Sequence, residues 1–363
     1  MGCNLKDLAS PESIDLSDLA GQRVAVDTFL VAYQFITSLR ARGEGKDGLY
    51  MRNAAGKPTS HLFGFLERAS TMIAAEIDPV FVFDGRPHEL KDHTLSERKE
   101  RRVAAEEKYA IALEAEDWKA VDKLGAQIVS YTPEMVAETK RLFDLMGVAW
   151  IEAPMEAEGA ASVWCRQGLV SGVASQDWDV LLYGSPVMIR NLTSHGTKKF
   201  GRTISAERIV LDDLLAEHEI TRDQLVDLGI MVGTDFHPGI RGIGPKTGLK
   251  LIKEYGSIEA ICEAKEKPLP ERLEEIRSIF HEHPVGEHTL PASGMADEKG
   301  LRTYLIDEMD FSERRVERAL EKLKSAGRCR TQGQSTLFDF CTIGAIIASW
   351  SSNKTDGRQG KPA

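Results

Sequence analysis

Seven carboxylates in this 363-residue chain follow predicted strands or helices and could together bind divalent metal ions. Short apolar runs such as residues 23–29 and 79–83 predict buried strands, and each of these runs reaches an acid at or just past its end. Ligands of parallel α/β sheets bind at the edge formed by the carboxyl ends of the strands, so we expect these acids to converge there. The set is Asp27, Asp84, Glu156, Glu158, Asp177, Asp179 and Asp235.

The chemistry that this set favours is metal-assisted phosphoryl transfer. Carboxylates without Cys or His ligands favour Mg²⁺ or Mn²⁺ over Zn²⁺. Two such ions about 4 Å apart form the clamp that stabilises in-line displacement at phosphorus. Glu156/Glu158 and Asp177/Asp179 are two residues apart, and in an extended chain such residues point the same way. We therefore expect each pair to act as one jaw of the site.

Each acid also has an ordinary structural interpretation. A single Asp after a strand is usually a helix N-cap or a turn residue, and one D-x-D pair also occurs in glycosyltransferases and some phosphatases. A phosphatase that used Asp27 as its nucleophile would need a second acid at position 29, where Phe29 stands. The joint pattern therefore favours the metal site over these separate readings.

The elements that must position these acids alternate between strand and helix, which predicts an α/β fold with a mostly parallel sheet flanked by helices. The segment 86–131 interrupts this pattern, and its polar stretch 96–126 predicts one long exposed helix that projects from the body. After a further predicted helix over 312–326, residues 327–363 have the composition of a flexible tail.

A glycine-rich loop, GIRGIGPKTG over 239–248, follows Asp235. Pro245 stands where a P-loop needs its Lys, so nucleotide binding is excluded. The alternative is a helix–hairpin–helix turn, whose backbone N–H groups approach a phosphate while the following helix adds positive charge. The residues expected to contact DNA there are Gly242, Gly244, Lys246, Lys250 and Lys253.

Positive charge is clustered although the net charge is −10, a total that by itself argues against a nucleic-acid partner. The projecting segment carries Lys91, Arg98, Arg101 and Arg102, of which the first, second and fourth lie near helical spacing. The alternative is an exposed helix stabilised by salt bridges to its own glutamates.

Taken together, these motifs resemble those of the flap endonucleases, members of the structure-specific 5′-nuclease superfamily. The resemblance spans residues 1–340 in family order and rests on VAVDTFLVAYQFI, TSHLFGFLER, PVFVFDGRPHELK, EAPMEAEGAA, SQDWDVLLYG, GTDF with the glycine loop, and FSERRVERALEKL. It implies a mixed, mostly parallel sheet between helices, with a helical arch and a helix–hairpin–helix element. It also implies Mg²⁺-dependent 5′-flap cleavage with weaker 5′–3′ exonuclease activity, in Okazaki fragment processing and base excision repair.

The same resemblance assigns roles to individual residues. The seven acids match the family's two-metal site, where Mn²⁺ can replace Mg²⁺. Lys91 and Arg98 match the groups at the arch base that steer the scissile phosphate, and Tyr33 matches a residue that stacks on a neighbouring base. The glycine loop matches a hairpin that grips duplex DNA with the help of K⁺.

The tail contains a peptide, residues 334–341, that resembles the motif by which partners dock on the sliding clamp PCNA. Its matching anchors are Gln334, Leu337 and Phe340, whereas Cys341 replaces the second aromatic residue of the motif. Such peptides insert a few apolar anchors into a pocket, so this replacement should weaken docking by about 1–2 kcal/mol.

The expected organisation is an N-terminal nuclease region over 1–105 and the rest of the arch over 106–131. An internal nuclease region with the hairpin follows over 132–262, then a helical region over 263–326 and the tail over 327–363. We expect a monomer that binds branched DNA and no membrane. A cytoplasmic location, as in an archaeal member, is expected, with the nucleus as the alternative.

A clamp-associated scaffold that binds branched DNA without cutting it is the competing function, and the intact set of acids argues against it.

Overall fold

The computed structural model describes residues 3–199, 201–285 and 289–329. The proposed clamp-binding peptide, 334–341, lies outside these residues. Within them, no helix is both long enough and apolar enough to cross a membrane.

A seven-stranded sheet forms the centre of the molecule, with the strand order β1-β9-β6-β5-β2-β3-β4. The five neighbouring strands β6, β5, β2, β3 and β4 are parallel to one another. Strand β9 is antiparallel to both of its neighbours, β6 and β1. The predicted fold class, a mixed and mostly parallel sheet flanked by helices, is therefore confirmed. The strands are β1 (Glu12–Ile14), β2 (Arg23–Asp27), β3 (Asp78–Phe83), β4 (Ala149–Glu152), β5 (Gly172–Ala174), β6 (Val187–Arg190) and β9 (Ala206–Val210), with a separate ribbon of β7 (Lys198–Lys199) and β8 (Arg202–Thr203).

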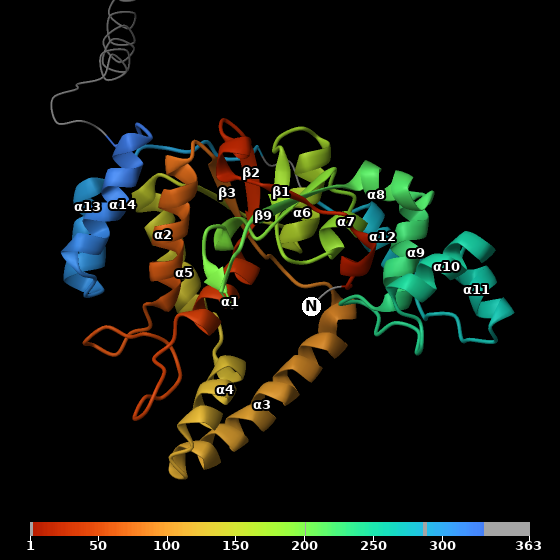
Figure 1. The fold of residues 1–363 in the computed structure, drawn as a ribbon, viewed down its shortest axis with the longest axis horizontal. Coiled ribbons are helices and arrows are strands. Elements are labelled where there is room, and N and C mark those ends of the chain that lie inside the picture. The colour runs from red at the N-terminus through yellow and green to blue at the C-terminus, as the bar shows by residue number, and fades with distance from the viewer. Residues whose placement is uncertain (1–2, 200, 286–288, 330–363) are drawn as a thin grey trace, which may run out of the picture.

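Helices cover both faces of this sheet (Figure 1). The α-helices before the glycine loop, including the two that project from the body, are α1 (Thr28–Ser38), α2 (Ser60–Ala74), α3 (Asp92–Glu114), α4 (Trp118–Ile128), α5 (Pro133–Met146), α6 (Ala157–Arg166), α7 (Asp179–Leu182), α8 (Leu211–His218) and α9 (Arg222–Val232). After it they are α10 (Pro245–Tyr255), α11 (Ile258–Ala264), α12 (Leu273–His281), α13 (Glu298–Arg302) and α14 (Glu313–Ser325).

The central strands are buried on both faces, which is why they read as continuous apolar runs. In β3, Val82 packs into a cluster with α6, α7 and α9, while Phe81 and Phe83 pack into a second cluster with α1, α2 and α5. Strand β2 ends at Asp27, earlier than the predicted strand over 23–29. It ends there because Asp27 caps α1 by accepting a hydrogen bond from the Leu30 amide at 3.1 Å.

The projecting segment is a helical hairpin rather than the single long helix predicted over 96–126. Figure 1 shows α3 and α4 extending together from one side of the body. The chain reverses where Glu116 takes a left-handed conformation (φ 53°), and the Asp117 side chain then caps α4 by accepting from the Ala120 amide. The single-helix prediction was wrong because the pattern of apolar residues does not register one left-handed residue.

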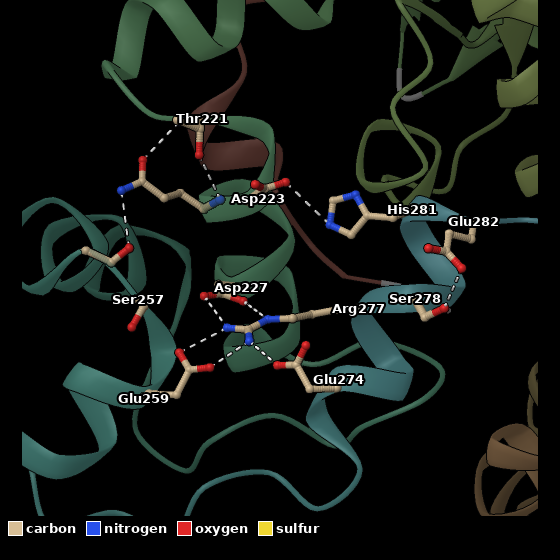
Figure 2. A pocket seen from close by; sticks show the side chains of 12 residues that line it. Thr221, Asp223, Asp227, Ser257, Glu259, Glu274, Arg277, Ser278, His281 and Glu282 are labelled. Atoms are coloured by element: carbon tan, nitrogen blue, oxygen red, sulfur yellow. Dashed lines mark hydrogen bonds and ion pairs between the residues drawn. The ribbon is translucent and has the colours of Figure 1, made fainter.

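Helices α9, α11 and α12 surround an open surface pocket of about 790 Å³ (Figure 2). Arg277 of α12 joins the three helices at its floor. Its guanidinium donates to Asp227 of α9 through two 2.8 Å hydrogen bonds and to Glu259 of α11 at 2.6 and 3.0 Å. The hydrogen bond from Arg277 lowers the pKa of Glu259 to about 2. This arginine therefore supports the helix that leads into the glycine loop.

Replacing Arg277 with Met should lower the free energy of unfolding by about 3 kcal/mol, because the buried Asp227 carboxylate loses its counter-charge. Urea unfolding measures this change. The matched control is Arg272→Met, whose ion pairs with Glu89 and Glu275 lie at the surface and should contribute far less to the free energy of unfolding. Equal losses for both variants would contradict the supporting role of Arg277.

Candidate metal centre

Four neighbouring parallel strands, β5, β2, β3 and β4, bring six of the seven predicted acids to one edge of the sheet. Asp27 is the last residue of β2, and Asp84 follows β3 directly. The two glutamates come after β4, and Asp177 and Asp179 come after β5. The seventh acid, Asp235, reaches the same region from the loop after α9. The sheet register thus sets the layout of the site.

Three of these acids form the tightest group. Carboxylate oxygens of Asp84, Glu156 and Glu158 all lie within 4.8 Å of one another. Asp84 is held by the first amide of α6, since its Oδ1 accepts from the Ala157 N–H at 2.8 Å. One end of a helix thus carries two of the acids and fixes the third.

Asp27, Asp177 and Asp179 lie beside this group and are held by short polar contacts. Asp27 accepts from the Ser175 hydroxyl at 3.2 Å, and Asp177 accepts from the Asp179 amide at 3.1 Å. The Asp179 carboxylate accepts from the Cys3 amide at 2.7 Å, across 176 residues of sequence. Their carboxylates are therefore oriented by the protein.

The prediction that the two acid pairs lie on extended chain was wrong. Glu156 is the N-cap of α6 and Glu158 lies in its first turn, while Asp179 is the first residue of α7. The positive end of a helix dipole stabilises anions at these positions. The side chains of Glu156 and Glu158 still meet, because a cap and a first-turn residue can face the same point beyond the helix end.

Lys91 and Arg98, at the base of the arch, provide the positive charge of the site. The Lys91 ammonium bonds Glu156 and lies 3.5 Å from the Asp235 carboxylate, while Arg98 donates to both Asp235 oxygens at 2.8 and 2.9 Å. The Thr94 hydroxyl adds a 2.9 Å hydrogen bond to the Asp235 carbonyl. Helix α3 is therefore fastened directly to the acidic cluster.

Burial of so much negative charge shifts the pKa values of these groups. Burial, reinforced by the charge of Asp84, raises the pKa of Asp27 to about 7. Burial likewise raises the pKa of Asp84 to about 6 and, with Asp177 adding to it, the pKa of Asp179 to about 8. Burial alone would lower the pKa of Lys91, but Glu158, Glu156 and Asp235 outweigh it and raise that pKa. The acids therefore need positive charge to ionise together.

The donor set fits divalent metal. It consists of carboxylates alone, and hard oxygen ligands of this kind suit Mg²⁺ or Mn²⁺. At the tightest point three of them already have ligand atoms close enough to share one ion.

The other predicted residues lie farther out. Arg101 and Arg102 are on α3, where they pair with Glu97 at 2.7 Å and Glu106 at 3.7 Å, as the salt-bridge alternative expected. Such exposed pairs contribute about 0–1 kcal/mol and leave the cations available to other anions. Tyr33 lies on α1 with 42% of its surface exposed.

The glycine loop connects α9 to α10 as a hairpin. Gly242 takes a left-handed conformation (φ 88°), and Gly244 is the N-cap of α10 with no side chain over the helix end. Nothing lies within 4 Å of the Cβ position at either glycine, so the loop surface is open. The Lys246, Lys250 and Lys253 side chains are exposed on α10, and Lys253 pairs with Glu219 at 3.0 Å.

Several contacts of the site carry no local sequence signal. The Cys3 amide, the Thr94 hydroxyl and the buried His283 ring come from segments outside the acidic motifs. Ser175 could have been identified, because it stands between a predicted strand end and Asp177. The other three depend on how distant segments pack.

Comparison with known proteins is consistent with this geometry. The XPG N-terminal domain model matches residues 4–105, and the XPG I-region model matches residues 147–235. Flap endonuclease 1 of Methanopyrus kandleri is 40% identical over 334 residues, covering 89% of this chain and 94% of that protein. Flap endonuclease 1 of Methanosarcina acetivorans is 40% identical over 335 residues, covering 91% and 98%.

Solved structures give the same result for the fold. Flap endonuclease-1 from Methanococcus jannaschii aligns with a TM-score of 0.70 at 35% identity, over 90% of this chain and 98% of that one. The catalytic core of Rad2 in complex with DNA substrate aligns with a TM-score of 0.65 at 22% identity, over 89% and 97%. The latter likeness concerns the fold alone.

The metal-free protein should lose stability as the pH rises from about 5 to 8. Asp27, Asp84 and Asp179 have folded-state pKa values of about 7, 6 and 8, above the usual value of 3.8. The folded state therefore binds more protons than the unfolded state in this range, so the free energy of unfolding falls with pH. Thermal unfolding in EDTA measures this trend.

Added Mg²⁺ should raise the midpoint temperature of unfolding, and should raise it more at pH 8 than at pH 5. A larger Mg²⁺ effect at pH 5 would contradict the prediction.

Proposed function

The chain belongs to the flap endonuclease family, and from this premise we propose that it is a structure-specific nuclease that cuts branched DNA at the base of a 5′ flap. Weaker 5′–3′ exonuclease activity accompanies this cleavage. The cellular processes that need such cuts are Okazaki fragment processing and base excision repair. The observation that carries the proposal is the group of Asp84, Glu156 and Glu158 beneath the cations of the arch base.

The proposed cofactor is a pair of Mg²⁺ ions, which Mn²⁺ can replace, held by the seven acids. When bound, the ions would supply an activated water and neutralise charge at the phosphate during in-line displacement. The protein's part is to hold the carboxylates in place. Asp84 is fixed by the α6 amide and Asp179 by the Cys3 amide, so little reorganisation is needed when the ions bind.

Lys91 and Arg98 are proposed to steer the scissile phosphate. Both cations contact the acidic cluster in this structure. Metal ions that neutralise the same carboxylates would weaken these contacts and leave the cations available to phosphate oxygens. Lys91 is well placed for this because it is buried and its ammonium is held over the Phe236 ring, 5.3 Å from the ring centroid. Positive charge aimed at the developing charge on the phosphate would stabilise the transition state.

DNA binding away from the cut is proposed to depend on shape rather than sequence. The open N-terminus of α10 at Gly244 offers backbone N–H groups to a phosphate, and Lys246, Lys250 and Lys253 add positive charge. A K⁺ ion at this hairpin is proposed as well. The arch cations Arg101 and Arg102 would contact the single-stranded flap, and the exposed Tyr33 would stack on a base beside the cut.

The remaining partners and properties are proposals of the same kind. The peptide 334–341, with Gln334, Leu337 and Phe340, would dock on the sliding clamp PCNA. We propose a monomer, located in the cytoplasm as for an archaeal protein, with the nucleus as the alternative. The regional divisions at 105, 131, 262 and 326 remain proposed boundaries.

Asp84→Asn should reduce flap cleavage by at least about 10³-fold, because it removes one metal-binding charge, while leaving flap binding nearly intact. The amide keeps the oxygen that accepts from the Ala157 amide, so the fold is preserved. The measurement is cleavage of a 5′-labelled double-flap DNA, with Mg²⁺ and with EDTA.

The matched control is Asp223→Asn, an exposed acid of the pocket in Figure 2, which should cut at the wild-type rate. Wild-type protein that binds the flap tightly but yields no product with Mg²⁺ would favour the non-cleaving scaffold. Loss of both binding and cutting in Asp84→Asn would mean that this residue is structural.

Lys253→Ala should weaken binding to all DNA sequences alike and reduce the slope of log affinity against log salt by about 0.9, the value for one phosphate contact. Glu219→Gln is the paired variant, since it frees Lys253 from its ion pair and should leave binding equal or tighter. Fluorescence anisotropy with two flaps of unrelated sequence measures both. A loss confined to one sequence would contradict phosphate contact.

A further inference from the structure

Two buried polar side chains, Tyr183 and His283, lie behind the acidic cluster. Their exposed fractions are 1% and 6%. Within the described part of the chain the Tyr183 hydroxyl makes no hydrogen bond, and the His283 ring, which makes none of good geometry, faces the backbone of Glu156. Buried polar groups in native proteins nearly always have a good hydrogen-bond partner, so two such side chains together point to a function.

The two rings connect the helices that carry the acids. Tyr183 is the residue after α7 and lies one turn beyond Asp179, whose carbonyl accepts the Tyr183 amide at 2.9 Å. The His283 ring packs against the first turn of α6, so closely that a Cβ at Gly159 would lie 2.5 Å from it. The rings of Tyr183 and His283 meet edge to face with centroids 5.1 Å apart. The pair therefore spans from Asp179 to the turn that carries Glu156 and Glu158.

Glu158 precedes Gly159, against which the His283 ring packs, and its carboxylate can take a further hydrogen-bond donor. The Glu158 carboxylate has Lys91 as a charged neighbour, but among the described residues it accepts no hydrogen bond. The half-buried Glu158 carboxylate is thus an acceptor without a donor next to the segment on which the buried Tyr183–His283 pair packs.

We propose that Tyr183 and His283 are positioning residues, which orient the Glu156–Glu158 turn by hydrogen bonding and so set the affinity of the centre for divalent ions. The proposal rests on the function proposed above. Residues that orient metal-binding side chains typically change metal affinity by about 10–100-fold when mutated. The ring packing of Tyr183 on Phe280, with centroids 5.0 Å apart, does not need the hydroxyl.

The test is Mn²⁺ binding to the full chain without DNA, followed by the electron paramagnetic resonance signal of free Mn²⁺. Tyr183→Phe keeps the ring and removes only the hydroxyl, and we expect it to raise the Mn²⁺ dissociation constant about tenfold. Flap cleavage should then need about tenfold more Mg²⁺ for half-maximal rate and reach the wild-type rate at saturation. Tyr131→Phe is the matched control, because that buried hydroxyl bonds Thr139 at 2.6 Å in the other core cluster. It should leave Mn²⁺ binding unchanged.

A second pair of variants keeps the proposal testable if Tyr183→Phe does not fold. His283→Leu should weaken Mn²⁺ binding, and His283→Gln, which keeps a polar group, should recover part of it. Wild-type Mn²⁺ affinity in both Tyr183→Phe and His283→Leu would overturn the proposal. Normal Mn²⁺ binding by the wild type without flap cleavage would instead count against the proposed nuclease function and leave the positioning role standing.

Discussion

The structure depends on one electrostatic constraint, which is the mutual repulsion of seven carboxylates, six at one edge of the sheet and one from the loop after α9. Like charges this close cannot all ionise in a buried site unless positive charge compensates them. The protein supplies part of this compensation itself. Lys91 and Arg98 contact the cluster from the arch, and the amides at the start of α6 and α1 donate to Asp84 and Asp27. Divalent ions would supply the rest.

The same constraint explains why the acids lie where strands give way to helices. A parallel strand delivers its last residue to the common edge, and the following helix presents the positive end of its dipole to that point. Asp27, Glu156 and Asp179 all lie at such junctions. Each of these three acids therefore lies at the start of a helix as well as in the shared cluster, and Asp27 also caps its helix through a side-chain hydrogen bond, as the ordinary interpretation expected.

Contacts at the base of α3 join the arch to the acidic cluster. Lys91, Thr94 and Arg98 lie within two turns at the base of α3, and each contacts an acid or its backbone. Any movement of α3 would therefore change the charge around the acidic cluster. Arg277 of α12 makes a second set of contacts between helices. It hydrogen bonds Asp227 of α9 and Glu259 of α11, and so holds α9, the helix before the hairpin loop, in place.

Residue types and their local order in the sequence determined the parallel strands, the acids at their ends and the hairpin loop. These are short-range features, because burial on both faces requires continuous apolar runs and the left-handed backbone at Gly242 favours glycine. Local pattern failed where a single backbone conformation mattered, as at Glu116, which splits the predicted arch helix in two, and at Glu158, which lies in the first turn of α6 instead of on extended chain. Only the tertiary structure decided which groups stand behind the acids. The Cys3 amide reaches Asp179, and His283 reaches the start of α6, through packing between segments more than 100 residues apart, which leaves no periodicity or motif in either segment.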